Sequence, residues 1–354
     1  MRKQTRQIRV GSIAVGGGTP ISIQTMTNSR TENVDATIEQ IRLATAAGCD
    51  IIRVSCPTPE STLSLRTIVK RSEIPIVADI HFDYKRAMEA IEAGAHCIRI
   101  NPGTMDGFGV REVVKSARDH GISLRIGVNS GSIERDILEK HGHPTADAIV
   151  DSAILSCKKL EDLDFFEFKV SLKSSDVTAT ITAYRKFSER MNYPLHLGVT
   201  EAGSVFSGTI KSSIGIGALI ADGIGDTIRV SLSSDILDEV KVGRQILKSL
   251  SLLPNSVNVV SCPTCSRTLI DIIKLSAAIE QSCENIPKSI KISILGCVVN
   301  GVEEAKQSDI GVFGFREGVA KIYLRGVEYQ TITEDKICHV VMDLIDGFCV
   351  PSSC

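Results

Sequence analysis

Eight short runs of apolar, β-branched residues recur in the first 245 residues, each followed by a polar loop and a helical pattern. They span residues 21–25, 51–55, 76–79, 97–100, 124–128, 166–171, 195–199 and 227–231. The segments between them carry helix signals, such as the amphipathic stretch that begins near residue 34 and ends at Ala46-Ala47-Gly48. Apolar strands that alternate with amphipathic helices favour a parallel sheet. Eight such units predict an α/β fold whose N-terminal domain is a (β/α)8 TIM barrel.

The composition changes near Leu253-Pro254-Asn255, which indicates a domain boundary. We therefore expect a barrel domain that binds substrate in residues 1–253, and a second, smaller α/β domain in residues 254–354. A β-hairpin over residues 7–15 precedes the barrel, and the glycines at 16–18 form the turn into its first strand. Neither they nor Gly215-Ile216-Gly217 have the strand–turn–helix context of a dinucleotide site.

Polar side chains gather where the predicted barrel strands end. Because the carboxyl ends of barrel strands meet at one mouth, the chemistry of a barrel enzyme is expected there. Several basic residues at one mouth repel one another unless an anion lies among them, and arginine offers two parallel hydrogen bonds to phosphate oxygens. The sequence thus predicts a polyanion site. The polar residues at the strand ends are Arg53, Asp79, His81, Arg99, Asn101, Arg125, Asn129, Lys173, Glu201, Arg229 and Ser231.

Three cysteines of the smaller domain have the spacing of metal ligands. Cys262 and Cys265 form a C-x2-C turn at the end of one predicted strand, and Cys297 ends another about thirty residues later. Cys283 lies within a helical pattern and is a poor candidate for a fourth ligand. A structural zinc site needs four ligands, whereas an iron–sulfur cluster tolerates a non-thiolate ligand at one iron. Spacing favours a redox cluster and leaves zinc and reduced core thiols open as alternatives.

The charge pattern excludes some classes of partner. A net charge of -2 gives no electrostatic case for nucleic acid or an anionic membrane. No apolar run reaches the roughly 18 residues that span a bilayer. The basic start passes directly into a predicted strand at residues 8–10, without the apolar core of a signal peptide, so we expect a cytoplasmic location. Cys49, Cys97 and Cys157 lie in apolar segments and are expected in the core.

Several long motifs resemble one enzyme family over the whole chain. Residues 261–268 (SCPTCSRT) and 296–301 (GCVVNG) closely resemble the 4-hydroxy-3-methylbut-2-enyl diphosphate synthase family, the iron–sulfur enzymes of the non-mevalonate route to isoprenoids. Residues 22–27, 78–82, 99–103, 125–129 and 198–203 also look like that family. Since no middle domain is inserted, the chain is similar to the short bacterial form.

The resemblance implies a function for these residues. It implies the reductive ring opening and dehydration of 2-C-methyl-D-erythritol 2,4-cyclodiphosphate by a head-to-tail homodimer, with reduced flavodoxin or ferredoxin as electron donor. One 4Fe–4S cluster per subunit would be held by Cys262, Cys265, Cys297 and Glu304. The diphosphate would be bound by Arg53, Arg99, Arg125, Lys173, Arg229 and Ser231, with His81 also at the mouth and Asn101, Asn129 and Asn300 positioning the substrate. Glu201 and Asp79 would act as acid or base.

One departure from the family lies next to the implied fourth ligand. The family usually has Pro-Gly where this chain has Val302-Glu303, so the loop loses both a fixed φ and a permissive glycine. Glu303 therefore competes with Glu304 as the fourth ligand. The main alternative function is a non-redox transferase on a barrel similar to dihydropteroate synthase, with a structural zinc site in the smaller domain.

Overall fold

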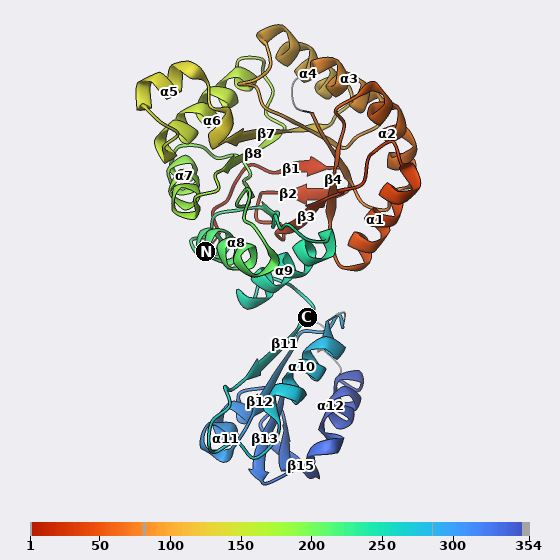
Figure 1. Cartoon of the computed structure of the whole chain (residues 1–354), viewed down its shortest axis with the longest axis vertical. Helices are drawn as coiled ribbons and strands as arrows, with labels where there is room; N and C mark the ends of the chain where they lie inside the picture. The colour runs from red at the N-terminus through yellow and green to blue at the C-terminus, as the bar shows by residue number, and fades with distance from the viewer. Residues whose placement is uncertain (1, 81–82, 285, 349–354) are drawn as a thin grey trace. The chain divides into compact units, whose positions relative to one another are not determined.

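The computed structural model describes residues 2–80, 83–284 and 286–348, and it separates into two compact units, Met1–Leu252 and Leu253–Cys354 (Figure 1). Each unit has a sheet and a core of its own. In the part of the chain that the structure describes, no helix is long and apolar enough to cross a membrane.

The first unit is built on eight parallel strands in chain order. β3 to β8 pair successively, β10 pairs with both β3 and β9, and a bridge between Val170 and Leu195 joins β8 to the strand that follows it. The strands close into a barrel, and the predicted fold class is confirmed. They are β3 (Ser22–Met26), β4 (Ile51–Ser55), β5 (Ile76–Asp79), β6 (Cys97–Ile100), β7 (Ser123–Asn129), β8 (Phe168–Lys173), β9 (His196–Leu197) and β10 (Thr227–Ile228).

Helices surround this barrel, as the upper part of Figure 1 shows. Many begin at a side chain that accepts a hydrogen bond from the first turn, as Thr58 does at the start of the second helix. Their inner faces cover Ile, Val and Leu side chains that point outward from the strands. They are α1 (Val34–Ala46), α2 (Pro59–Arg71), α3 (Tyr84–Glu92), α4 (Gly107–Asp119), α5 (Arg135–His141), α6 (Ala146–Glu161), α7 (Val177–Arg190), α8 (Val205–Ala221) and α9 (Ile236–Ser249), with a 3₁₀ turn at Ser130–Ser132.

The predicted N-terminal hairpin forms from β1 (Ile8–Val10) and β2 (Ile13–Val15). Its buried side chains pack against residues at the amino-terminal ends of β4, β5 and β6 in one apolar cluster, namely Ile8, Val10, Val15, Ile51, Val77 and Cys97. The glycines at 16–18 all have positive φ, as their role in the turn requires. The hairpin therefore covers the floor of the barrel, opposite to the carboxyl ends of the strands.

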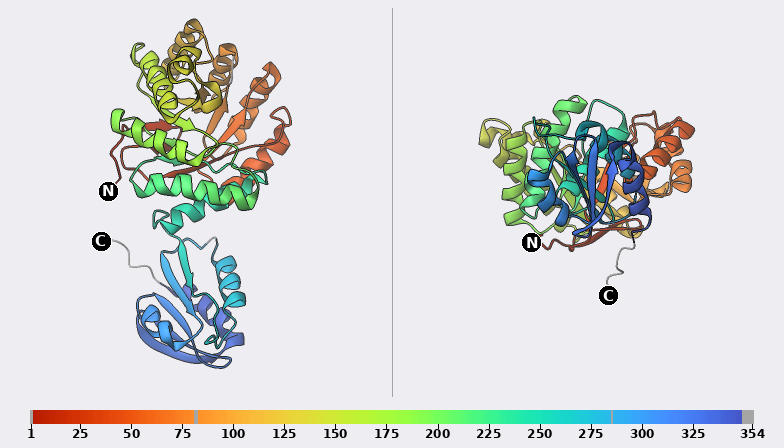
Figure 2. Two further views of the ribbon diagram at one scale, coloured as in Figure 1. Left: turned by 60° about the vertical axis from the view of Figure 1, so that its left-hand side comes forward. Right: turned by 90° about the horizontal axis from the view of Figure 1, so that it is seen from below.

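The second unit is a five-stranded sheet in the order β11-β12-β13-β14-β15. Its elements are β11 (Val257–Ser261), α10 (Ile272–Cys283), β12 (Ile290–Leu295), α11 (Val298–Lys306), β13 (Ile310–Arg316), β14 (Val319–Leu324), β15 (Val327–Thr333), a 3₁₀ turn (Glu334–Lys336) and α12 (Ile337–Asp346). In Figure 2 the helices lie on both faces of this sheet. α10 and α12 share one apolar core with β12 and β13, and α11 packs on the opposite face through Ala305 and Phe313.

The structure differs from the sequence expectations in a few element bounds. β8 starts at Phe168 and extends to Lys173, and β9 and β10 are only two residues long. The edge strand β15 was not predicted, because most of its residues are exposed and no apolar run marks it. It follows a tight turn at Arg325-Gly326, where both residues have positive φ. Cys49, Cys97 and Cys157 are buried as expected.

Candidate active site

The barrel strands bring the predicted basic residues into the interior near the carboxyl ends. Arg99 is the register partner of Arg125 across β6 and β7. Asp79 is in turn the partner of Arg99 across β5 and β6. Four of these cationic side chains are at most 8% exposed and the fifth is largely covered. They are Arg53, Arg99, Arg125, Lys173 and Arg229, called the mouth cations below.

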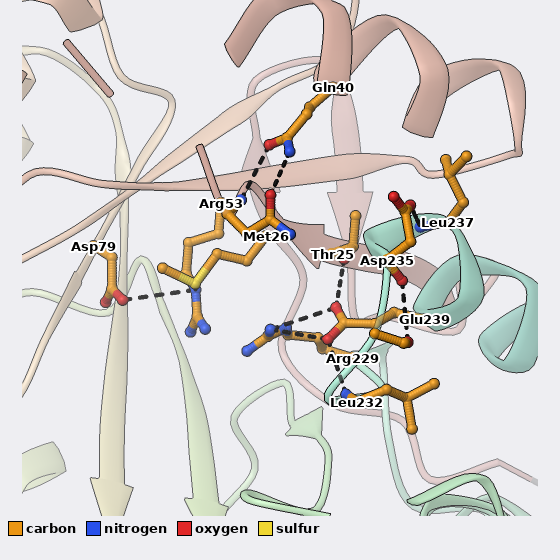
Figure 3. A network of polar contacts seen from close by, with 12 residues as sticks. Thr25, Met26, Gln40, Arg53, Asp79, Arg229, Leu232, Asp235, Leu237 and Glu239 are labelled. Carbon is orange, nitrogen blue, oxygen red and sulfur yellow. Dashed lines mark hydrogen bonds and ion pairs between the residues drawn. The ribbon is translucent and has the colours of Figure 1, made fainter. Parts of the chain in front are cut away.

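Asp79 is the predicted mouth carboxylate, and it lies between two of the mouth cations. Its Oδ2 is 3.7 Å from Arg53 Nε, and its Oδ1 is 3.4 Å from Arg99 Nη1. Arg53 Nε also donates to Met26 Sδ at 3.1 Å (Figure 3). Asp79 is shared by two guanidinium groups and Glu239 is paired with Arg229, so two carboxylates stand against five cations. The mouth therefore keeps an excess of positive charge.

The pKa values of the mouth cations record this excess. Burial, which is the largest cause, and the positive charges of Arg53 and Arg99 hold the pKa of Arg125 well below its usual value, although the Asp79 carboxylate acts in the opposite direction. Burial and four neighbouring arginines do the same to the pKa of Lys173. The pKa of Arg229 falls to about 10, again chiefly through burial. An anion would favour the charged form of every one of these groups, so the mouth is electrostatically suited to bind one.

Two glycines make room for the cationic side chains. A Cβ at Gly127 would lie 2.6 Å from Arg99 Nε, and one at Gly198 would lie 2.8 Å from Lys173 Nζ. Any larger residue at these inward positions would displace the cation beside it. Both glycines occur in the motifs that resemble the family, and the contacts give a physical reason for their presence there.

Arg229 is held by Glu239, a residue that the sequence analysis missed. Arg229 Nη2 lies 3.3 Å from Glu239 Oε1, which also accepts from the backbone N–H of Leu232 at 3.0 Å. Thr25 Oγ1 donates to Glu239 Oε2 at 2.6 Å, and the carboxylate is 5% exposed (Figure 3). Glu239 lies in the first turn of α9, where sequence alone suggests only a favourable helix terminus. The available signal was its place on the buried face of that helix.

The remaining predicted mouth residues have mixed surroundings. Asn101 is 4% exposed, and its amide joins two loop groups: Nδ2 donates to Ser132 Oγ at 2.9 Å, and Oδ1 accepts from Gly103 N at 3.0 Å. Asn129 N donates to the same Ser132 hydroxyl at 3.4 Å, so both asparagines help to shape this loop. Ser231 is partly buried after β10. His81 lies outside the described residues.

Glu201 follows β9 on an exposed turn and has a φ of 53°. A left-handed backbone at a residue other than glycine costs free energy, and such residues cluster at functional sites. Gly203, two residues later, has a φ of 107°. The turn thus holds an acidic side chain in solvent beyond the carboxyl end of a barrel strand.

The cysteine loops of the second unit lie side by side. Cys262 N donates to Ile294 O at 3.3 Å, and Gly296 N donates to the Cys262 sulfur at 3.2 Å, directly before Cys297. Backbone N–H groups at Arg267 and Thr268, together with the Arg267 charge and the Thr268 hydroxyl, lower the pKa of the exposed Cys265, with Arg267 N–H the largest cause. Such donors stabilise thiolates, the form that binds metals.

No three His, Cys, Asp or Glu side chains among the described residues stand close enough together to hold a metal ion. The chemistry of the cysteine loops nevertheless fits sulfur ligation. Cys262 and Cys297 are partly exposed and Cys265 is exposed, and backbone N–H groups are directed at the sulfurs of Cys262 and Cys265. Cys283, by contrast, is the last residue of α10 and is buried in the core.

The two candidate carboxylates on α11 are both paired with lysines. Glu304 Oε1 is 2.9 Å from Lys291 Nζ on the neighbouring strand β12, and both side chains are about one-third exposed. Glu303 is more exposed, and its Oε1 lies 2.8 Å from Lys306 Nζ one helical turn along. Asn300 is exposed in the first turn of the same helix. Of the two carboxylates, the less exposed Glu304 is held on the sheet side of the helix.

Family models match both units of the chain. Residues 5–244 match the GcpE TIM-barrel domain, and residues 258–347 match the GcpE protein C-terminal domain. A relative from Rhodospirillum rubrum, named 4-hydroxy-3-methylbut-2-en-1-yl diphosphate synthase (flavodoxin), is 52% identical over 98% of this chain and 91% of its own length. A relative of the same name from Caulobacter vibrioides is 51% identical over 98% of this chain and 90% of its own length.

Among solved structures, the barrel is similar to dihydropteroate synthases. The enzyme from Stenotrophomonas maltophilia matches with a TM-score of 0.52 at 13% identity, over 70% of this chain and 99% of that chain. A likeness at this identity concerns the fold alone, so it lends no support to transferase activity.

Proposed function

The chain belongs to the GcpE family, and on this premise we propose how its residues carry out the reaction of a 4-hydroxy-3-methylbut-2-en-1-yl diphosphate synthase. The reaction opens the ring of 2-C-methyl-D-erythritol 2,4-cyclodiphosphate by reduction. It consumes two electrons and one proton and releases one water. The product is an open diphosphate with one more negative charge than the cyclic substrate.

The observation that supports the site assignment is the group of five mouth cations, with which only two carboxylates among the described residues form ion pairs, Asp79 and Glu239. A diphosphate supplies the negative charge that these side chains lack. Arg125 and Lys173 bind it from the barrel wall, and Arg229 is aimed by Glu239. Ser231, Arg53, Arg99 and His81 complete the binding site. As the opened diphosphate gains charge, these cations stabilise it more strongly than the cyclic form.

The acid–base roles follow from position. Glu201, on its left-handed turn beyond β9, delivers the proton with which the substrate hydroxyl departs as water. Asp79 lies between two guanidinium groups, which stabilise it as a carboxylate, so it orients the cations rather than donating a proton. Asn101 and Asn129 hold the loop against which the substrate carbon chain lies, and Asn300 contacts the substrate from the second unit.

Cys262, Cys265 and Cys297 hold one 4Fe–4S cluster per subunit, with Glu304 as the fourth ligand. When bound, such a cluster would supply electrons one at a time, and reduced flavodoxin, the donor in the relatives' name, or ferredoxin would be their source. The Gly296 N–H that donates to Cys262 and the lowered pKa of Cys265 support thiolate ligation. Glu304 is favoured over Glu303 because Lys291 holds it on the inner side of α11. The cytoplasmic location stays a prediction.

The cysteines and the mouth cations belong to separate units, so the reaction needs a cluster-bearing unit to meet a barrel. We assign this role to a head-to-tail homodimer, in which the second unit of one chain covers the mouth of the other. Mixing Arg125→Met chains with Cys297→Ser chains tests it. About half of the dimers would contain one chain of each kind, and one of the two sites in such a dimer would combine an intact barrel with an intact cluster unit. The mixture should therefore show about a quarter of wild-type activity. Inactivity of the mixture would show that each chain uses its own cluster.

The reaction itself is tested with anaerobically purified chain, the cyclic diphosphate and a low-potential one-electron donor. Product formation should require the cluster, and Lys173→Met should raise KM for the cyclic diphosphate at least tenfold while the iron content stays unchanged. Equal KM values for Lys173→Met and wild type would contradict the assignment of the mouth.

A further inference from the structure

Level with Arg125, and deeper in the barrel than Lys173, the interior contains a second basic residue on β8. Lys169 is fully buried and stands four residues before Lys173 on the same strand. At about 3.3 Å per residue, it lies roughly 13 Å closer to the floor of the barrel.

The direction of Lys169 follows from the alternation of side chains along β8. Lys173 points into the barrel, since its Nζ lies 2.8 Å from the Cβ position of Gly198 on a neighbouring strand end. Residues two and four positions away share that face. Lys169 is also the register partner of Arg125 on β7, so the two cationic side chains stand side by side inside the barrel.

Several donors around Lys169 have no hydrogen-bond acceptor among the described residues. They are Lys169 Nζ and, on its register partner, Arg125 Nε and Nη1. His196, from the adjoining β9, is also fully buried; its Nδ1 lies 3.2 Å from Thr227 Oγ1, and its Nε2 has no partner in the described chain. Unsatisfied buried donors are rare in native proteins, and a bound water or ion is the usual reason for them.

The positive charge at this depth is also uncompensated. Burial and the charge of Arg125 lower the pKa of Lys169 to about 8, so the amine is still mostly cationic at neutral pH. Asp226 is the carboxylate whose charge raises the pKa of Lys169, but it already accepts hydrogen bonds from Arg2 at 3.1 Å and from the backbone N–H of Leu195 at 2.9 Å. Two adjacent buried cations with donors to spare call for an anion rather than for water alone.

We propose that Lys169, Arg125 and His196 form a second anion site, deeper than the diphosphate site, for a small inorganic anion of the halide class. Its size is limited by the floor, where the N-terminal hairpin packs against Ile51, Val77 and Cys97. A monatomic anion accepts hydrogen bonds from several directions and needs no donor of its own, which matches a set of donors without acceptors. The ion would also fix the inner edge of the Arg125 guanidinium, leaving the outer edge for the substrate.

Bromide is a direct probe of this site. Crystals of the full wild-type chain grown in sodium bromide, without substrate, should give an anomalous peak at the bromine edge within hydrogen-bonding range of Lys169 Nζ and Arg125. Ordered water alone at this place, or side chains packed so tightly that nothing fits, would overturn the proposal. The measurement does not depend on turnover, so it remains informative if the proposed function fails.

Two variants separate the deep site from the mouth. Replacing gluconate with chloride at constant ionic strength should raise the melting temperature of wild type. Lys169→Met should show neither this rise nor the bromide peak. Lys173→Met, which removes a mouth cation, should keep both. An equal chloride effect in wild type and Lys169→Met would refute the site. Should Lys169→Met fail to fold, the wild-type bromide map still decides the question.

Discussion

Glu239 is predicted to orient Arg229, and removing its carboxylate should damage both stability and substrate binding. In Glu239→Ala, the Leu232 N–H, the Thr25 hydroxyl and the Arg229 guanidinium all lose their acceptor. Leaving a mostly buried cation and two donors unpaired should cost about 3 kcal/mol of the free energy of unfolding. Glu239→Gln keeps the volume and one carbonyl oxygen for Leu232 N–H, so its cost should be near 1 kcal/mol.

The catalytic effect should follow the charge rather than the volume. With Glu239 gone, Arg229 no longer has a fixed orientation at the mouth, and kcat/KM should fall roughly 10- to 100-fold in both variants, mainly through KM. Denaturant unfolding and steady-state kinetics on the same preparations measure the two effects. Asp238→Asn removes a charge from the same helical turn without touching Arg229, and it should change stability by less than about 0.5 kcal/mol.

The reasoning is refuted if Glu239→Ala unfolds within about 0.5 kcal/mol of wild type. It is also refuted if the variant is strongly destabilised but keeps the wild-type KM. The second result would make Glu239 a purely structural residue that fastens α9 to β3.

Three further predictions concern other parts of the chain. Glu304→Ala should lower turnover sharply while iron analysis finds the cluster retained on three thiolates, and Glu303→Ala should do neither; the reverse pattern would make Glu303 the ligand. Gly198→Ala places a Cβ 2.5 Å from Arg229 O and should lower the free energy of unfolding by about 1–3 kcal/mol. Gly217→Ala is the control, because the space around Gly217 is open, and it should stabilise α8 by up to about 1 kcal/mol in the same denaturation assay. The pKa of Lys169 is lowered to about 8, so between pH 8 and the ordinary lysine pKa the unfolded chain binds more protons than the folded one. The free energy of unfolding of wild type should therefore rise with pH relative to that of Lys169→Met. Parallel pH profiles of the two proteins would contradict this prediction.

The barrel could be predicted because its signal is repeated eight times. Buried parallel strands such as Ile51–Ser55 and Cys97–Ile100 are short apolar runs between helical segments, and their bounds match the structure. The strand ends in turn predicted which basic side chains lie close together, because register-paired residues on neighbouring strands lie at the same height in the barrel. Arg99 and Arg125 are such a pair on β6 and β7. Edge strand β15 lacked this signal because an exposed edge needs no apolar pattern.

Contacts between distant segments could not be predicted. Glu239 reaches Thr25 across more than two hundred residues, and its place on the buried face of α9 does not show which residues it contacts. The partner of Glu304 was equally hidden, since Lys291 lies on β12 and meets it only when α11 packs on the sheet. Lys169 was missed for a different reason: a lysine inside a predicted buried strand contradicts the usual burial preferences.

The proposed function makes the chain an iron–sulfur enzyme that reduces a cyclic diphosphate. Its most direct test is iron, sulfide and zinc analysis of the anaerobically purified chain, combined with the electron count per product formed. The account predicts a brown protein with about four iron and four sulfide per chain. It also predicts two electrons consumed for each diphosphate opened. A colourless protein with about one zinc per chain and no reduction of the cyclic diphosphate would contradict it.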